Sequence, residues 1–128
     1  MDNSCVLKLY RMFFNKIDFD RIGIRNENQP NFELQASVAE NEEGLFKVEV
    51  VLIGEKRDEY KIRIVLDGIF GFISDGTVDA KLKNRLIQTN AVAILLPYLR
   101  SEVSILTAQP DTESVVLPPL NVNELFKK

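Results

Sequence analysis

The fold is decided by residues 32–66, which read FELQASVAENEEGLFKVEVVLIGEKRDEYKIRIVL. Residues 32–38 alternate strictly between apolar and polar side chains, which is typical of a strand with one buried face. Similar alternation returns in residues 45–53 and again in residues 60–66. Two polar, glycine-bearing turn segments at 41–44 and 54–58 separate these runs, so the stretch predicts three consecutive antiparallel strands.

Upstream of this stretch, residues 6–14 are apolar at both odd and even positions, with Lys8 and Arg11 as the only charges. They predict a first strand that meets other groups on both faces and continues through residues 17–22. Residues 26–31, with Pro30, predict a loop or a crossover. Downstream, the last strand is expected to continue to residue 73 through Gly68 and Gly71. We therefore expect a four-stranded antiparallel meander over residues 6–73.

From about residue 79 the period changes to that of a helix. The pattern predicts one helical stretch over 79–88 and a second from an N-cap at Asn90 to about residue 107. Pro97 predicts a kink or break near Ile94, because it removes one backbone hydrogen bond. The first apolar stripe follows the i, i+3, i+4, i+7 spacing and comprises Val92, Leu95, Leu96, Leu99, Val103 and Leu106. A second apolar stripe lies on another side of the helix and comprises Ile94, Tyr98 and Ile105.

A helix that is apolar on two sides needs two covering surfaces, and in a small domain the second is expected to be another subunit. After a polar loop at 109–114, the prolines at 118 and 119 predict an extended segment, and residues 123–128 predict one terminal helical turn. At 128 residues the chain is expected to be a single α+β domain, 1–128. The residues alone predict an antiparallel sheet with a two-sided apolar helix in an oligomer.

Composition excludes several kinds of chemistry. The chain has no histidine and one cysteine, Cys5, so histidine-dependent nucleophiles, histidine zinc sites and an intrachain disulfide are ruled out. No phosphate-binding motif follows the glycines, and we expect neither a cofactor nor a metal nor an enzymatic activity. A net charge of -3 speaks against nucleic-acid binding. With no signal-like start and no long apolar stretch, we expect no membrane insertion and a cytoplasmic location.

Two segments carry a family resemblance. Residues 94–103, ILLPYLRSEV, are similar to the kinked-helix segment of the SecB family of bacterial export chaperones, and residues 116–126, VLPPLNVNELF, resemble the run into that family's last helix. Gly68-Ile69-Phe70 and the first strand, from Leu9 to Phe19, also resemble their counterparts. The similarity covers nearly the whole chain in order.

The resemblance implies a four-stranded antiparallel sheet with a long kinked helix and a short C-terminal helix on one face. It also implies a homotetramer, a dimer of dimers with the long helices at its interface, and ATP-free holding of unfolded polypeptides in apolar grooves. It implies that clients contact strand one, strand two and the last turn, and that the first helical stripe forms the interface. The groove candidates are Ile17, Phe19, Phe32, Leu34, Ala36, Leu125 and Phe126, and the interface candidates are Leu95, Leu96, Leu99, Val103 and Leu106. For Phe32 and Leu34, ordinary core packing is the alternative.

The chain departs from the family where export-dedicated members contact the SecA motor. Such members carry acidic and apolar residues there, whereas the matching positions here are Lys16, Asp20, Lys61 and Arg63. Three basic residues would repel a motor surface suited to carboxylates. We therefore expect a SecB-like chaperone either for export or, outside that route, for a toxin–antitoxin pair. A scaffold that binds one folded partner is the main alternative, and a carboxylate enzyme the least favoured one.

Overall fold

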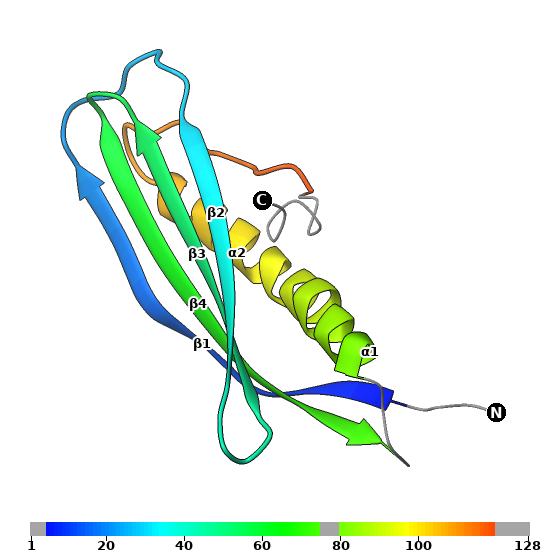
Figure 1. The fold of residues 1–128 in the computed structure, drawn as a ribbon. Helices are drawn as coiled ribbons and strands as arrows, with labels where there is room; N and C mark the ends of the chain where they lie inside the picture. Colours follow the sequence, from blue (N-terminus) through cyan, green and yellow to red (C-terminus); the bar gives the residue numbers. More distant parts are fainter. Residues whose placement is uncertain (1–4, 75–79, 120–128) are drawn as a thin grey trace.

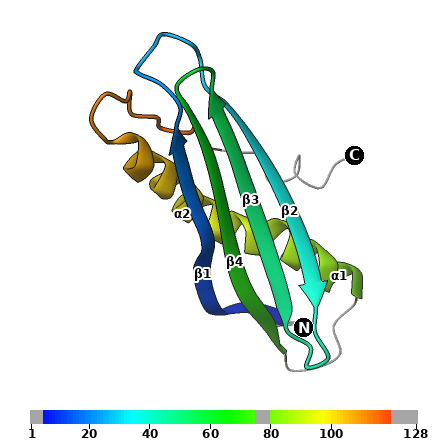
Figure 2. The ribbon, with the colours of Figure 1, turned by 90° about the vertical axis from the view of Figure 1, so that its left-hand side faces the viewer.

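The computed structural model describes residues 5–74 and 80–119. Four long strands form one sheet, and a helical segment crosses a single face of it (Figure 1). Figure 2 shows the helix running behind all four strands. The elements are β1 (Cys5–Arg21), β2 (Asn31–Glu40), β3 (Phe46–Lys56), β4 (Tyr60–Ser74), α1 (Ala80–Arg85), the π-helical segment η1 (Leu86–Ala91) and α2 (Val92–Thr107).

The strand order is β1-β4-β3-β2, with every neighbouring pair antiparallel. The predicted meander is correct for β2, β3 and β4 but wrong for β1, which crosses over to pair with β4. The reason lies in the connection, because residues 22–30 are far longer than the two-residue turn that joins strands in a tight hairpin. The alternative of a crossover at this loop is confirmed. Both β1 and β2 are therefore edge strands.

The core lies between the sheet and α2. Alternate residues of β3 and β4 face the helix and are completely covered, among them Val50, Leu52 and Ile64. On the helix side, Leu95 and Leu99 are equally covered and belong to the same cluster. Burial of each such aliphatic side chain stabilises the fold by roughly 1.5–3 kcal/mol relative to exposure. This cluster fixes which face of α2 points at the sheet.

The helical part differs from the two-stretch prediction. Residues 80–107 follow one another as α1, η1 and α2 without an interruption. Asn90 lies inside η1, and the residues flanking that segment, Arg85 and Val92, both have right-handed helical angles, so Asn90 caps nothing. Pro97 lies within α2, and the break predicted near Ile94 does not occur. The irregularity is the π-helical turn one to two turns earlier.

The predicted fold class, an antiparallel four-stranded sheet with a long helix on one face, is confirmed. The predicted C-terminal turn over residues 123–128 lies outside the described residues. Within residues 5–74 and 80–119, no helix combines the length and the apolarity needed to cross a membrane.

Candidate functional site

The groove candidates on β2 lie in one row at the edge of the sheet. Phe32, Leu34 and Ala36 pair with Gly54, Leu52 and Val50 of β3, which places them on the helix-facing side. We call these three residues, together with Val38, the β2 row. The first three are half-buried and pack against the core, and Val38 is 36% exposed.

Gly54 determines how the β2 row is seated. A Cβ atom at this position would lie 2.6 Å from the Phe32 ring, so the absence of a side chain lets the ring lie directly over the β3 backbone. The row is thus neither ordinary core nor open surface. One side of Phe32 and Leu34 packs against the core, and the rest of each side chain remains accessible; their contact with clients stays a prediction.

The two candidates on β1 lie at the opposite edge of the same face. Phe19 is half-buried, with its ring centroid 5.0 Å from that of Tyr60, and Ile17 is 45% exposed. In register, Phe19 faces Ile62 of β4, which in turn faces Gly54. Two strands therefore separate the β1 candidates from the β2 row, a distance of roughly 14 Å. The structure does not bring the two sets into contact, and Leu125 and Phe126 lie outside the described residues.

The helical stripe assigned to a subunit interface is used inside the protomer. The residues Leu95, Leu99 and Val103 are fully covered, Leu96 is 5% exposed, and Leu106 is half-buried against the same core. They face the sheet, so they are not available to a second subunit, and this assignment does not fit their burial. The exposed stripe is the other one, with Ile94, Tyr98 and Ile105 being 37%, 48% and 64% exposed.

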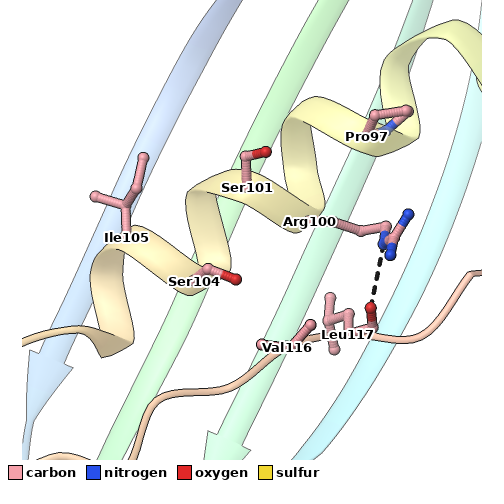
Figure 3. Close-up of a pocket in the computed structure, with 7 residues that line it drawn as sticks. All are labelled: Pro97, Arg100, Ser101, Ser104, Ile105, Val116 and Leu117. Carbon is pink, nitrogen blue, oxygen red and sulfur yellow. Dashed lines mark hydrogen bonds between the residues drawn. The ribbon is translucent and has the colours of Figure 1, made fainter.

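A segment that follows the helix, residues 113–119, runs back along α2, and we call it the strap. Three hydrogen bonds fasten it to the helix: Arg100 Nε donates to Leu117 O at 3.1 Å, Ser104 Oγ donates to Val115 O at 3.0 Å, and Val115 N donates to Thr107 Oγ1 at 2.9 Å. Between strap and helix lies a pocket of about 570 Å³ (Figure 3). Its lining comprises Pro97, Arg100, Ser101, Ser104, Ile105, Val116 and Leu117.

This strap pocket was not foreseen from the sequence. Its signal is the spacing of Arg100, Ser104 and Thr107, which places three polar side chains on one helix face. An extended proline-bearing segment has unpaired backbone groups, and these side chains satisfy them. Of the residues that line the pocket from the strap, Val116 is 78% exposed and Leu117 is 7% exposed.

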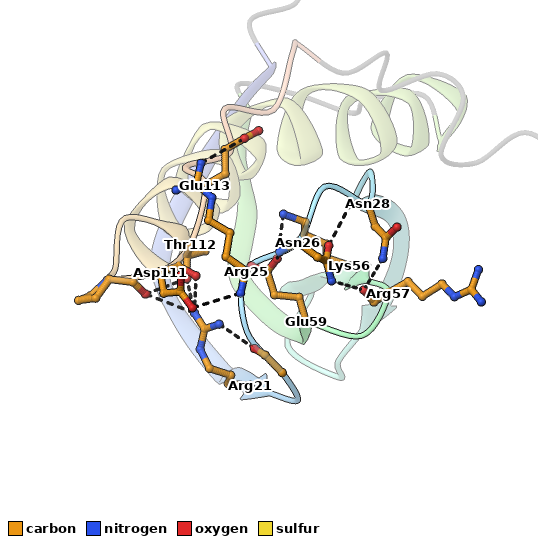
Figure 4. Close-up of polar contacts among 12 residues, drawn as sticks. Arg21, Arg25, Asn26, Asn28, Lys56, Arg57, Glu59, Asp111, Thr112 and Glu113 are labelled. Atoms are coloured by element: carbon orange, nitrogen blue, oxygen red, sulfur yellow. Dashed lines mark hydrogen bonds and ion pairs between the residues drawn. The ribbon is translucent and has the colours of Figure 1, made fainter.

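Three loops meet at one end of the sheet (Figure 4). They are the crossover loop, residues 22–30, the β3–β4 turn, residues 57–59, and residues 108–113 after α2. The turn carries Asp58 with a left-handed φ of 62°, and a Cβ at Gly23 would lie 2.4 Å from the Asp58 carbonyl oxygen. Glycine at position 23 is therefore what allows the crossover loop to lie against the turn.

Glu59 anchors the crossover loop from within the protein. Its side chain is fully buried, with Lys56 Nζ 2.9 Å from Oε1, which also accepts a hydrogen bond from Asn26 N at 2.8 Å. Its backbone carbonyl accepts from the amides of Ile22 and Gly23. Burial alone would raise the pKa of this carboxyl, but the hydrogen bonds from Lys56 and Asn26 and the charges of Lys56 and Arg21 lower it below its ordinary value.

Because the pKa of Glu59 is lowered, the free energy of unfolding depends on pH in the acidic range. A carboxyl whose pKa is lower in the folded state stabilises the protein above its unfolded-state value near 4.5, and this contribution is lost as the pH falls through the folded-state pKa. We expect the free energy of unfolding, measured by urea titration, to fall from about pH 5 downward, and the dependence to flatten in Glu59→Gln. That variant should also lose about 3 kcal/mol at pH 7, since it leaves the Lys56 charge buried and unpaired.

The matched control for this series is Glu55→Gln. Glu55 contacts Lys61 at 3.9 Å on the surface, where both side chains are more than half exposed, and should contribute little. An acid dependence that is the same in Glu59→Gln and in the unmodified chain would contradict the role assigned to Glu59.

The four positions compared with the SecA-contacting surface lie on strands β1 and β4. In register, Asp20 faces Lys61, and Asp18 faces Arg63. Lys16 lies 3.7 Å from Asp18, with both side chains about half exposed. The basic residues are therefore interleaved with carboxylates rather than gathered into a basic patch, and of the four compared positions Asp20 alone is acidic.

Across residues 5–74 and 80–119, no three histidine, cysteine or acidic side chains come together in a way that could hold a metal ion. The site that remains is apolar. It consists of the β2 row, the strap pocket, whose lining also includes Arg100, Ser101 and Ser104, and the exposed helical stripe, and it offers contacts to apolar side chains.

No protein-family model matches the chain. In sequence, it is 27% identical over 126 residues to an uncharacterised protein of Methanocaldococcus jannaschii, covering 93% of this chain and 81% of that one. It is also 27% identical over 101 residues to the protein-export protein SecB of Cellvibrio japonicus. That match covers 77% of this chain and 60% of SecB, so the chain spans less than two thirds of that relative.

Two solved structures share the architecture. The SecB-like chaperone of Mycobacterium tuberculosis, in complex with a ChAD peptide from the HigA1 antitoxin, superposes with a TM-score of 0.76 at 13% identity, covering 90% of this chain and 91% of that one. A protein of unknown function from Streptococcus agalactiae gives a TM-score of 0.52 at 20% identity, covering 90% and 98%. The sequence resemblance to SecB and the architecture shared with a SecB-like chaperone together confirm that this chain is SecB-like in fold.

Proposed function

We propose that the chain is a molecular chaperone that holds non-native polypeptides without using ATP. The observation that carries the proposal is the β2 row, in which Phe32, Leu34 and Ala36 are half-buried on the helix-facing side of an edge strand. Such side chains are fixed by the core on one side and open to an apolar segment of a client on the other. The SecB-like fold supports the same function.

The energetics favour many weak contacts over one tight pocket. Burial of apolar surface contributes about 25 cal/mol per Å² whatever the sequence that supplies it. A short row therefore binds any extended apolar segment weakly and with little selectivity. Several rows presented by one assembly would add through effective concentration.

We propose a homotetramer as that assembly, with the exposed helical stripe as a contact between subunits. Ile94, Tyr98 and Ile105 form an apolar line along α2 on the side away from the sheet, and Val116 of the strap lies beside it. Covering such a line with a second copy removes apolar surface from water. A cytoplasmic location and the absence of enzymatic activity belong to the same proposal, because they come with the SecB-like resemblance.

The test is a light-scattering aggregation assay without nucleotide. A chemically unfolded model protein is diluted into buffer with the chain, with an equal mass of an unrelated protein, or alone. We expect suppression of scattering near one tetramer per client and none from the unrelated protein. Scattering equal to that of the unrelated protein would contradict general holding.

A client-restricted form of the same function is the second candidate. The M. tuberculosis neighbour was solved with a peptide from an antitoxin, and the positions of Lys16, Lys61 and Arg63 lack the acidic character of export-dedicated members. A restricted chaperone should bind extended antitoxin-type peptides yet leave the aggregation of model proteins unchanged. Tight binding to SecA in a calorimetric titration would contradict a role outside the export route.

A further inference from the structure

The side chain of Arg21, at the end of β1, joins two loops that are distant in sequence. Its Nη1 donates to Gly23 O at 3.0 Å in the crossover loop. Its Nη2 reaches the carbonyl oxygens of Pro110 and Asp111 at 3.4 and 3.3 Å and the hydroxyl of Thr112 in the loop after α2 (Figure 4). A planar guanidinium can serve several acceptors in fixed directions, which an ammonium group cannot.

Arg25 adds a second connection between the same loops. Its backbone N donates to Asp111 Oδ2 at 3.1 Å, and its Nη2 lies 3.5 Å from Glu113 Oε2. Asp111 has a left-handed φ of 57°, a conformation that aspartate tolerates better than most residues. The crossover loop and residues 110–113 are therefore held together by nitrogen donors of Arg21 and Arg25 on one side and by carbonyl, hydroxyl and carboxylate oxygens on the other.

Each loop leads directly into one part of the candidate site. The crossover loop ends at the start of β2, one residue before Phe32, the first member of the β2 row. Residues 110–113 lead into the strap, whose Leu117 lines the strap pocket. Arg21 is also 5.9 Å from the ring centroid of Phe19, so a third candidate residue lies against the same guanidinium.

We propose that Arg21 is a positioning residue that couples the crossover loop to the strap, so that the β2 row and the strap pocket keep their relative positions when a client binds. The inference rests on the proposed holding function. Arg21 is itself exposed, so its bonds fix the loops without contributing to the core. Loosening the loops should shorten the lifetime of a bound client more than it slows the encounter.

The experiment compares Arg21→Ala and Arg21→Lys with Arg57→Ala in the full chain. Arg57 is matched in type, and its side chain is 83% exposed and lies 3.9 Å from Asp58. Its backbone carbonyl accepts hydrogen bonds from Asn26 and Asn28, and the substitution by alanine keeps that carbonyl. Hydrogen exchange is followed at Arg25 N and Asn26 N in the crossover loop, and at Val115 N in the strap. Both Arg21 variants should exchange about tenfold faster at all three amides, because local opening becomes easier, while core amides such as Leu52 stay protected.

The second measurement is the dissociation rate of a chemically unfolded, fluorescently labelled client. We expect an increase of about three- to tenfold for both Arg21 variants and none for Arg57→Ala. Because lysine retains the charge, equal effects in Arg21→Lys and Arg21→Ala identify the guanidinium fork as the cause, and full rescue by lysine would overturn that assignment.

The two readouts separate this inference from the proposed function. Faster exchange in the crossover loop alone would show that the loops are held independently and would overturn the coupling. Faster exchange in both loops with an unchanged dissociation rate would overturn the positioning role. Failure of the unmodified chain to hold any client would contradict the proposed function and the predicted effect on client dissociation. The exchange data decide the coupling of the loops by themselves.

Discussion

Replacing Leu99 by aspartate is expected to unfold the protomer. Leu99 is 0% exposed and packs in the cluster that joins α2 to the helix-facing side of the sheet. A carboxylate placed there has no partner, and its burial costs several kcal/mol. Because domains of this size are stable by only about 5–15 kcal/mol, the loss should leave little folded protein at 25 °C. Circular dichroism and urea titration measure the effect.

Ile105→Asp is the control, since Ile105 lies one helical face away and is 64% exposed. It should keep the circular dichroism spectrum of the unmodified chain and, if the exposed stripe joins subunits, lower the mass measured by light scattering. A folded Leu99→Asp protein of reduced mass would instead place Leu99 at a subunit interface and contradict the core position described above.

The sequence predicts the strands well because their signal is local. Alternation in residues 32–38 identifies the face on which Phe32 and Leu34 lie, and the short turns predicted at 41–44 and 54–58 dictate the pairing of β2, β3 and β4. The position of β1 could not be predicted in the same way. A nine-residue connection is compatible with more than one neighbour, and only the packing of the whole sheet selects β4.

The face of α2 that packs on the sheet could not be predicted for a related reason. Both stripes of α2 are apolar, and nothing in their spacing says which meets the protomer's own sheet. The pattern of leucines was assigned to the interface, whereas the structure assigns it to the core and leaves Tyr98 and Ile105 exposed. The π-helical turn could not be predicted either, because an asparagine such as Asn90 is compatible with an N-cap and also with a helix interior.

The contacts among the three loops at the end of the sheet could not be predicted, because they join polar residues that lie about 90 positions apart in the sequence. Arg21 was only the end of a strand in the sequence, and Thr112 was part of a polar loop. Their meeting depends on the crossover of β1 to the β4 edge, which brings the end of β1 beside the loop that follows α2 (Figure 1). The contact thus depends on tertiary topology, and no local sequence pattern predicts it.

The double substitution Phe32→Ser with Leu34→Ser is expected to abolish most of the holding activity. It removes the two largest side chains of the β2 row, and at about 25 cal/mol per Å² the lost contact area corresponds to a loss of client affinity of about tenfold or more. Aggregation suppression and client titration by fluorescence measure this loss. Val6→Ser with Ile73→Ser is the matched control, because these two residues face each other across β1 and β4 and are 55% and 51% exposed.

The same two residues also support the core, so stability has to be measured alongside activity. Val38→Ser separates the two effects, since Val38 belongs to the row but is 36% exposed and should barely change the unfolding midpoint. If the row binds clients, Val38→Ser weakens holding while the protein stays as stable as before. Undiminished holding by a folded double variant would rule out the β2 row as the contact surface. If the double variant unfolds and Val38→Ser keeps full holding activity, Phe32 and Leu34 serve only in core packing.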